Sequence, residues 1–281
     1  MENKKLRDAV ESWKKQVLVP YMLNADNDCD KDGKYCGKQS GRVGQVLSCP
    51  YYMGLTEEYI KNMVDDKKLR IMIIGQEARH YGSWADDREK PNFMAERSQL
   101  WAIEYLQRQL DINYQPQVFK DLDHKRSGFW KVFRDLKNKY KESVLLCWNN
   151  IDKVYYAPQK EDKSKEAYKG TLTYEAESYL SRRYGDDNKS LLQREIEIAK
   201  PNVLLFVTGP SYYLSMATAF GIDPVNLKSK LTKELEIVDV TSELKSDIPA
   251  FWTYHPCNRL GINCADVFQK QSVVKNKITL Q

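Results

Sequence analysis

Side chains capable of acid, base and hydrogen-bonding chemistry gather in three short stretches, each of which follows an apolar run. A carboxylate, a carboxamide and an imidazole together suit a reaction in which one part of the substrate becomes positive and another negative. Cleavage of an N-glycosidic bond is such a reaction, because the sugar becomes oxocarbenium-like while the leaving base takes the electrons. The residues in question are Gln76, Glu77, Arg79 and His80; Asn149 and Asn150; and His255.

Each residue type has a distinct part in that chemistry. The carboxylate of Glu77, placed below the sugar, would stabilise the cation and orient a water molecule. An imidazole N–H of His255 aimed at a base carbonyl would stabilise the departing anion, as an oxyanion hole does. An amide donates and accepts at once, so Asn149 or Asn150 is suited to reading the edge of a flipped base.

The apolar runs before these residues predict the strands that position them. Residues 71–74 are apolar without alternation and run into Gly75, which predicts a buried parallel strand that ends there in a tight turn. Residues 143–148, 203–207 and 249–254 have the same character. With helices between them, they predict an α/β fold, a three-layer α/β/α sandwich around a mostly parallel sheet of about four strands. Ligands of such sheets bind at the carboxyl ends of the strands.

The remaining segments are assigned from periodicity and breakers. We predict an N-terminal helical and loop extension over residues 1–65 and one α/β domain over 66–281. Helices are expected over residues 1–20, ended by Pro20, and over 56–65, 96–110, 189–200 and a stretch after Ser127; a loop over 24–50; a flexible insertion over 158–170; and an edge strand over 234–240.

Composition restricts the class of protein. The 281 residues are 42% hydrophobic and 30% charged, and neither a membrane span nor a secretory signal is evident. Six cysteines are too few for a disulfide scaffold in a chain of this length, so a cytoplasmic protein is expected. The net charge of +5 permits an anionic partner such as DNA, and no obligate protein partner is evident.

Two features of the predicted loop bear on metals. Residues 28–33 copy the first half of a calcium loop, but Gln39 stands where a bidentate Glu is needed. Cys29, Cys36 and Cys49 lie in the same stretch without a CxxC pair or an obvious fourth ligand. We therefore expect no metal and no organic cofactor.

The sequence resembles the uracil-DNA glycosylase superfamily in four ordered motifs covering about residues 66–270. Residues 75–80, Gly-Gln-Glu-Ala-Arg-His, look like the water-activating motif Gly-Gln-Asp-Pro-Tyr-His. Residues 255–260 look like the leaving-group loop that contains His-Pro-Ser. Residues 148–153 are similar to the strand-end Asn motif, and residues 200–209 resemble the Lys-Pro-Asp strand that ends in Gly.

The resemblance implies a fold, an activity and roles for particular residues. It implies a uracil-DNA-glycosylase-like fold and excision of a flipped, damaged or deaminated base from DNA. Glu77 would activate water, His255 would stabilise the leaving group, and Asn150, or Asn149 if the register slips by one, would read the base. Gln76 and His80 would also contact the base, and Trp84 or Phe93 would stack on it. The expected DNA contacts are Arg79, Arg126, Lys153, Asn258 and Arg259.

Other interpretations stay open at this point. Glu77 is also typical of a helix cap, His255 of a structural histidine, and either asparagine of a residue that satisfies loop backbone. Lys153, Arg126 and Arg259 are either surface residues or phosphate ligands. At the level of function, the alternatives are a catalytically inactive nucleic-acid- or nucleotide-binding module of the same fold and a hydrolase of small glycosides or esters.

Overall fold

The sheet at the centre of the molecule is mostly parallel. The computed structural model describes residues 1–23, 46–77, 90–111, 113–119, 128–157, 174–231 and 237–255. Its five-stranded sheet has the order β3-β2-β5-β7-β6, in which only β6 is antiparallel to its neighbour. The strands are β2 (Leu69–Glu77), β3 (Val144–Asp152), β5 (Val203–Phe206), β6 (Val238–Asp239) and β7 (Ala250–Trp252). The prediction of an α/β protein with a mostly parallel sheet is confirmed, and the fifth strand, β6, lies at the edge of the sheet within the edge strand predicted over residues 234–240.

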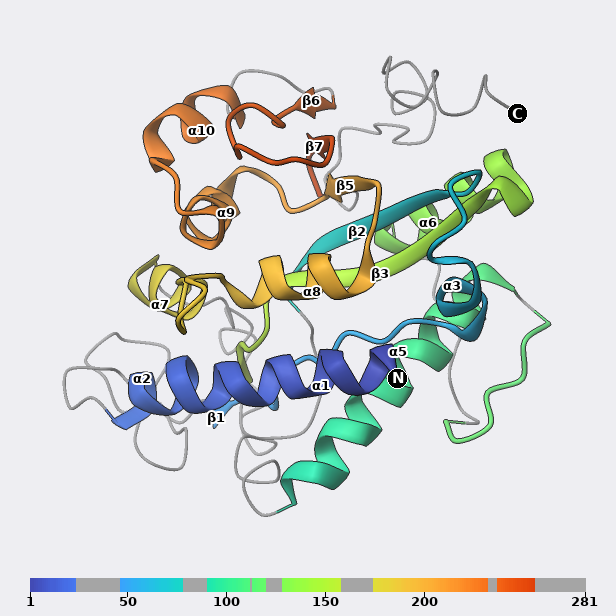
Figure 1. Ribbon diagram of the computed structural model, residues 1–281, viewed down its shortest axis with the longest axis horizontal. Coiled ribbons are helices and arrows are strands. Elements are labelled where there is room, and N and C mark those ends of the chain that lie inside the picture. The colour runs from blue at the N-terminus through green and yellow to red at the C-terminus, as the bar shows by residue number, and fades with distance from the viewer. Residues whose placement is uncertain are drawn as a thin grey trace, which may run out of the picture.

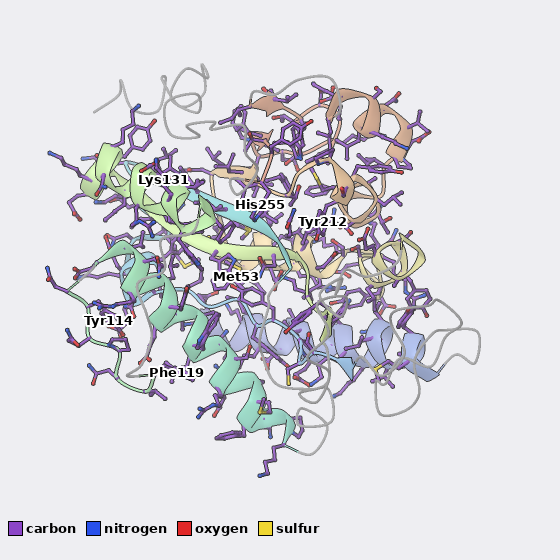
Figure 2. All side chains as sticks on the ribbon, turned by 180° about the vertical axis from the view of Figure 1, so that it is seen from behind. Met53, Tyr114, Phe119, Lys131, Tyr212 and His255 are labelled. Atoms are coloured by element: carbon purple, nitrogen blue, oxygen red, sulfur yellow. The ribbon has the colours of Figure 1, made fainter. Side chains whose placement is uncertain are left out.

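Helices lie on both faces of this sheet. Helix α8 passes on one side of β3 and α6 lies on the other, as the two opposite views show (Figures 1 and 2). The helices are α1 (Glu2–Trp13), α2 (Val19–Leu23), α3 (Glu57–Asn62), α5 (Pro91–Leu110), α6 (Gly128–Tyr140), α7 (Tyr174–Leu180), α8 (Leu191–Ala199), α9 (Tyr213–Phe220) and α10 (Pro224–Leu231). A separate antiparallel pair is formed by β1 (Val46–Leu47) and β4 (Tyr156–Ala157).

Strand β2 is the centre of the core, and it does not end where the sequence predicts. Residues 71–74 have no exposed surface and pair with β3 on one side and β5 on the other. The predicted turn at Gly75 is wrong, because pairing with β3 continues through Gly75 opposite Asn150 to Glu77 opposite Asp152. Gly75 is needed for close packing instead. A Cβ there would lie 2.7 Å from Asn150 Oδ1 and 2.9 Å from a ring carbon of Phe129.

Strand β3 is also longer than predicted, continuing past Trp148 to Asp152. It lies at the edge of the sheet, yet all nine of its residues are buried. The segment before α3 covers the edge: Tyr51 donates its backbone N–H to the Lys153 carbonyl at 2.7 Å, and its hydroxyl to the Trp148 carbonyl at 3.0 Å. Covering an edge in this way removes a template for pairing with other chains.

The N-terminal helix belongs to the same body as the sheet. Leu6 has no exposed surface and lies in one hydrophobic cluster with β2, β3 and β5. The helical path does not end at Pro20, as predicted, but continues to Leu23. A π-helical stretch, Lys14–Leu18, precedes α2 and places Pro20 in the first turn of that helix. Pro20 thus lies directly after an existing irregularity of the helical hydrogen-bond ladder, where its missing N–H interrupts no regular α-helical run.

None of the helices in the described ranges combines the length and the apolar content needed to cross a bilayer.

Candidate functional site

One glutamine ties together the carboxyl ends of β2 and β5, and the end of β7 lies beside them. Gln76, near the end of β2, donates its side-chain Nε2 to the backbone carbonyl of Thr208 at 2.7 Å. Gly209 follows with a positive φ of 75°, and a Cβ built on it would lie 3.8 Å from both Gln76 Nε2 and the backbone nitrogen of His255. The ends of β2, β5 and β7 therefore meet at one point, as expected for parallel strands.

Asn150, on β3, lies opposite Gly75 of β2. Its Oδ1 accepts a hydrogen bond from Trp148 Nε1 at 3.1 Å, which fixes which end of the amide is oxygen. The residue is 2% exposed, and among the described residues no acceptor lies within hydrogen-bonding distance of Asn150 Nδ2. An unmade hydrogen bond at a buried donor costs about 1–3 kcal/mol. The amide is thus a donor held in place without an acceptor among the described residues.

Phe129 and His255 complete the cluster. Phe129 lies in the first turn of α6, and its ring packs over Gly75. The imidazole of His255 is nearly parallel to that ring, with an interplanar angle of 7° and centroids 6.0 Å apart. Figure 2 shows His255 beside β2 on the side of the sheet covered by α6. The amide of Asn150 and the ring of Phe129 therefore meet at the glycine of β2, and the imidazole of His255 lies against that ring.

Phe129 is the residue that sequence reasoning missed. Residues 129, 133, 136 and 140 repeat at the spacing typical of a core-facing helix side. In the structure Phe129 is half-buried and packs against the core, and the imidazole of His255 stacks on its ring. No pattern of apolar residues separates a core aromatic from one at a site, so the distinction needed the position of β7.

The neighbouring asparagine points elsewhere. Successive side chains of a strand point to opposite faces, so Asn149 and Asn150 diverge. Asn149 Nδ2 donates to Glu195 Oε2 at 2.9 Å, and its Oδ1 accepts from Lys153. Lys153 in turn forms an ion pair with Glu195 at 2.7 Å, in which the side chains are 4% and 0% exposed. The predicted base contact Asn149 and the predicted DNA contact Lys153 thus lie inside the protein, beneath α8.

Burial dominates the ionisation of this pair. Desolvation lowers the pKa of Lys153, and the attraction of Glu195 opposes that shift. Desolvation likewise raises the pKa of Glu195 against the opposing effects of Lys153 and Asn149. A lysine that binds a DNA phosphate must reach the protein surface, and the side chain of Lys153 does not.

The other predicted residues fall into two groups. Phe93 lies at the start of α5, is 56% exposed, and has Arg97 above its ring at 5.8 Å. The backbone of Glu77 is opposite Asp152, but its side chain lies outside the described part of the structure. Outside the described residues altogether lie His80, Arg79, Trp84, Arg126, Asn258, Arg259, Cys29, Cys36 and residues 28–33. In the part that is described, no three potential metal ligands cluster, and Cys49 is buried.

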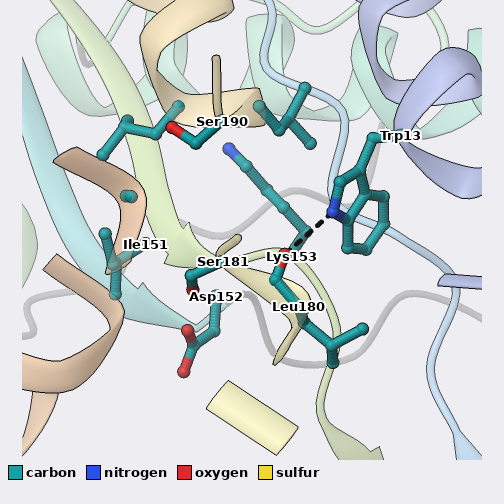
Figure 3. A pocket seen from close by; sticks show the side chains of 10 residues that line it. Trp13, Ile151, Asp152, Lys153, Leu180, Ser181 and Ser190 are labelled. Carbon is teal, nitrogen blue, oxygen red and sulfur yellow. Dashed lines mark hydrogen bonds between the residues drawn. The ribbon is translucent and has the colours of Figure 1, made fainter. Parts of the chain in front are cut away.

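Two cavities lie apart from Asn150, Phe129 and His255. One has a volume of about 20 Å³ and lies between Lys153, Trp13 and Ser190, as Figure 3 shows. It has room for one water molecule but not for a small-molecule ligand. The other, of about 620 Å³, is an open hollow beside α10 that includes the ion pair of Lys230 with Glu243. The case for a site at the strand ends thus comes from converging polar groups.

Comparison with known proteins gives no assignment: no protein-family model matches the chain, and no curated protein has significant sequence similarity to it.

Proposed function

We propose that this protein is a glycosylase with a uracil-DNA-glycosylase-like fold, which cleaves the N-glycosidic bond of a flipped, uracil-like base in DNA. The observation that carries the proposal is that Asn150 and Phe129 meet at Gly75, with His255 stacked on Phe129, near the carboxyl ends of β2, β3 and β7. The order of the four motifs along the chain supports it independently.

The buried donor of Asn150 fits a base that carries a carbonyl. A keto oxygen of a pyrimidine would accept from Nδ2 and satisfy the group that has no acceptor in the described part of the free protein. Asn150 is covered in the free protein, so the base would have to displace the ring of Phe129 sideways and then stack against it. Stacking of this kind contributes about 1–3 kcal/mol per base.

The reaction follows from the roles of two further residues. As the glycosidic bond breaks, its electron pair moves to the base, and an N–H of His255 stabilises the negative oxygen. The carboxylate of Glu77, which follows Gln76 at the end of β2, stabilises the oxocarbenium ion and accepts a proton from the attacking water. The products are the free base and an abasic site.

The experiment uses the full chain and oligonucleotides that contain uracil, hypoxanthine, xanthine or a thymine mismatch. We expect an abasic product, detected as alkali-sensitive strand breaks, from at least one of them. Glu77→Gln and His255→Ala should each lower the rate at least a hundredfold, which is the scale of about 3 kcal/mol expected for losing one charge-stabilising group.

Glu58→Gln is the matched control, because Glu58 is an exposed glutamate on α3 that undergoes the same chemical change. Its rate should equal that of the unchanged protein. Binding to DNA that weakens with salt, without any abasic product and without sensitivity to Glu77→Gln, would contradict the proposal and favour the inactive binding module.

A further inference from the structure

We propose that the buried triad of Asn149, Lys153 and Glu195 is a positioning device that holds Asn150 in its reading orientation. None of the three would touch the substrate. The inference rests on the proposed function in so far as Asn150 reads the base, and it assigns a role to three polar residues that the proposed reaction does not use.

One oxygen atom joins the triad to Asn150. Asn149 Oδ1 accepts from Lys153 Nζ and also from the backbone N–H of Asn150, the latter at 2.8 Å. Asn149 Nδ2 is held at the same time by Glu195. Both ends of the Asn149 amide are therefore fixed, and the backbone from which the Asn150 side chain projects is fixed with them.

The opposite face of the strand completes the restraint. Asn150 Oδ1 accepts from Trp148 on the side of α6, while its backbone N–H is restrained on the side of α8. These two hydrogen bonds, one on each face of the sheet, restrict the orientation of the Asn150 amide. Small displacements of such a group are costly for function, because a misplacement of about 1 Å can reduce a rate about a hundredfold.

The far end of the device is anchored in a short, well-capped helix. Ser190 begins α8 with a capping box in which its side chain accepts from the Gln193 backbone and the Gln193 side chain accepts from the Ser190 backbone. Glu195 lies one turn further along and has no exposed surface. Helix α8 also packs on α1, so the carboxylate extends from a fixed support.

Stability alone does not explain an ion pair at this place. Burying two charges costs several kcal/mol per ion, and well-packed apolar residues often serve as well or better. The cavity of about 20 Å³ beside Lys153 is too small to admit a nucleotide, so the ammonium serves no ligand from that side (Figure 3). What the ion pair of Lys153 and Glu195 does provide is a fixed position for the Asn149 side chain at the end of β3.

The test compares two substrates on the same sample of each variant. The variants are Asn149→Ala, which removes the bridge, and Glu195→Gln, which keeps an acceptor for Asn149 but removes the charge opposite Lys153. The readout is the ratio of kcat/KM for uracil-containing and hypoxanthine-containing single-stranded oligonucleotides. A loss of folded protein lowers both values equally and cancels in this ratio, so a purely structural role would leave the ratio unchanged.

We expect both variants to move the ratio in the direction set by Asn150→Ala, by about tenfold or more. Leu227→Ala is the control: it removes a buried side chain of α10 and should lower stability without moving the ratio. A ratio in Glu195→Gln and Asn149→Ala equal to that of the unchanged protein would overturn the inference.

A second measurement does not depend on catalysis. The side-chain amide signal of Asn150 in an NMR spectrum, identified by its loss in Asn150→Ala, should shift or broaden in Glu195→Gln and remain in place in Leu227→Ala. If the unchanged protein excises no base, the proposed function fails while this signal still decides the positioning role. An undisturbed Asn150 signal in Glu195→Gln would refute the inference in either case.

Discussion

Two adjacent asparagines at the end of β3 have opposite environments. Asn149 has both ends of its amide bonded inside the protein, to Glu195 and Lys153. Asn150 has its oxygen bonded to Trp148 and its nitrogen without an acceptor in the described structure. An unsatisfied buried donor is uncommon in folded proteins and asks for an explanation. A ligand carbonyl provides one.

Phe129 gives a prediction at the same scale. We expect Phe129→Ala to raise the KM for a uracil-containing oligonucleotide about ten- to hundredfold, because stacking on an aromatic face contributes about 1–3 kcal/mol. Phe129→Leu keeps the apolar contact with Gly75 but lacks a flat face, and it should show most of the same loss. Steady-state kinetics on both variants measures this. A KM in Phe129→Leu close to that of the unchanged protein would show that the ring serves packing alone.

At the scale of the element, β3 is buried like a central strand although it lies at the edge of the sheet. One of its residues, Cys147, has no exposed surface, and the thiol of Cys147 lies 3.8 Å from the Ile71 carbonyl of β2. Burial raises the pKa of Cys147 to about 12. The free thiol has a pKa of about 8.5, so the unfolded chain loses this proton at a lower pH than the folded one.

This difference predicts an alkaline dependence of stability. The contribution of Cys147 is fully present below the unfolded pKa and is lost as the pH rises toward the folded pKa. Urea unfolding at about pH 8 and about pH 10 should therefore show the unchanged protein losing stability relative to Cys147→Ala, by up to about 1.4 kcal/mol per pH unit. A difference between the two proteins that stays constant with pH would place the ionisation of Cys147 near its ordinary value.

At the scale of the whole molecule, the N-terminal helix and the sheet share one core. Leu6 of α1 and Tyr51 of the following segment lie in the cluster that contains β2. Asn3 is bonded in both directions to the backbone of Leu55, at 2.9 Å and 2.8 Å. Elements joined by a common core are expected to unfold together in one transition.

Leu6→Ala tests that expectation. The change should lower the global free energy of unfolding by about 2–5 kcal/mol, as buried Leu to Ala changes do. Native-state hydrogen exchange of the amides of residues 71–74 should report the same loss, although they lie far from residue 6 in the sequence. Val64→Ala, at a position 72% exposed, is the control and should change little. Unaltered protection of β2 in Leu6→Ala would mean that residues 1–23 unfold independently.

The sequence by itself determined the class of the fold and most of its elements. Apolar runs such as residues 71–74 are typical of one element of an α/β fold, a strand covered on both faces. The helical periodicity of residues 191–199 and the cap at Ser190 are likewise local properties of the chain. These features can be predicted because the burial and the hydrogen bonds that stabilise them involve residues close in sequence.

The tertiary structure decided which polar residues face the strand ends. Which of Asn149 and Asn150 is bonded to α8 depends on which face of β3 packs against that helix. The residues near them in the sequence do not determine this. Lys153 looks like any surface lysine until Glu195, from another element, neutralises it inside the protein. Gly75 looks like a turn until Asn150 and Phe129 occupy the space of its missing Cβ. In each case the deciding interaction joins segments distant in sequence, so only the folded chain brings the two partners together.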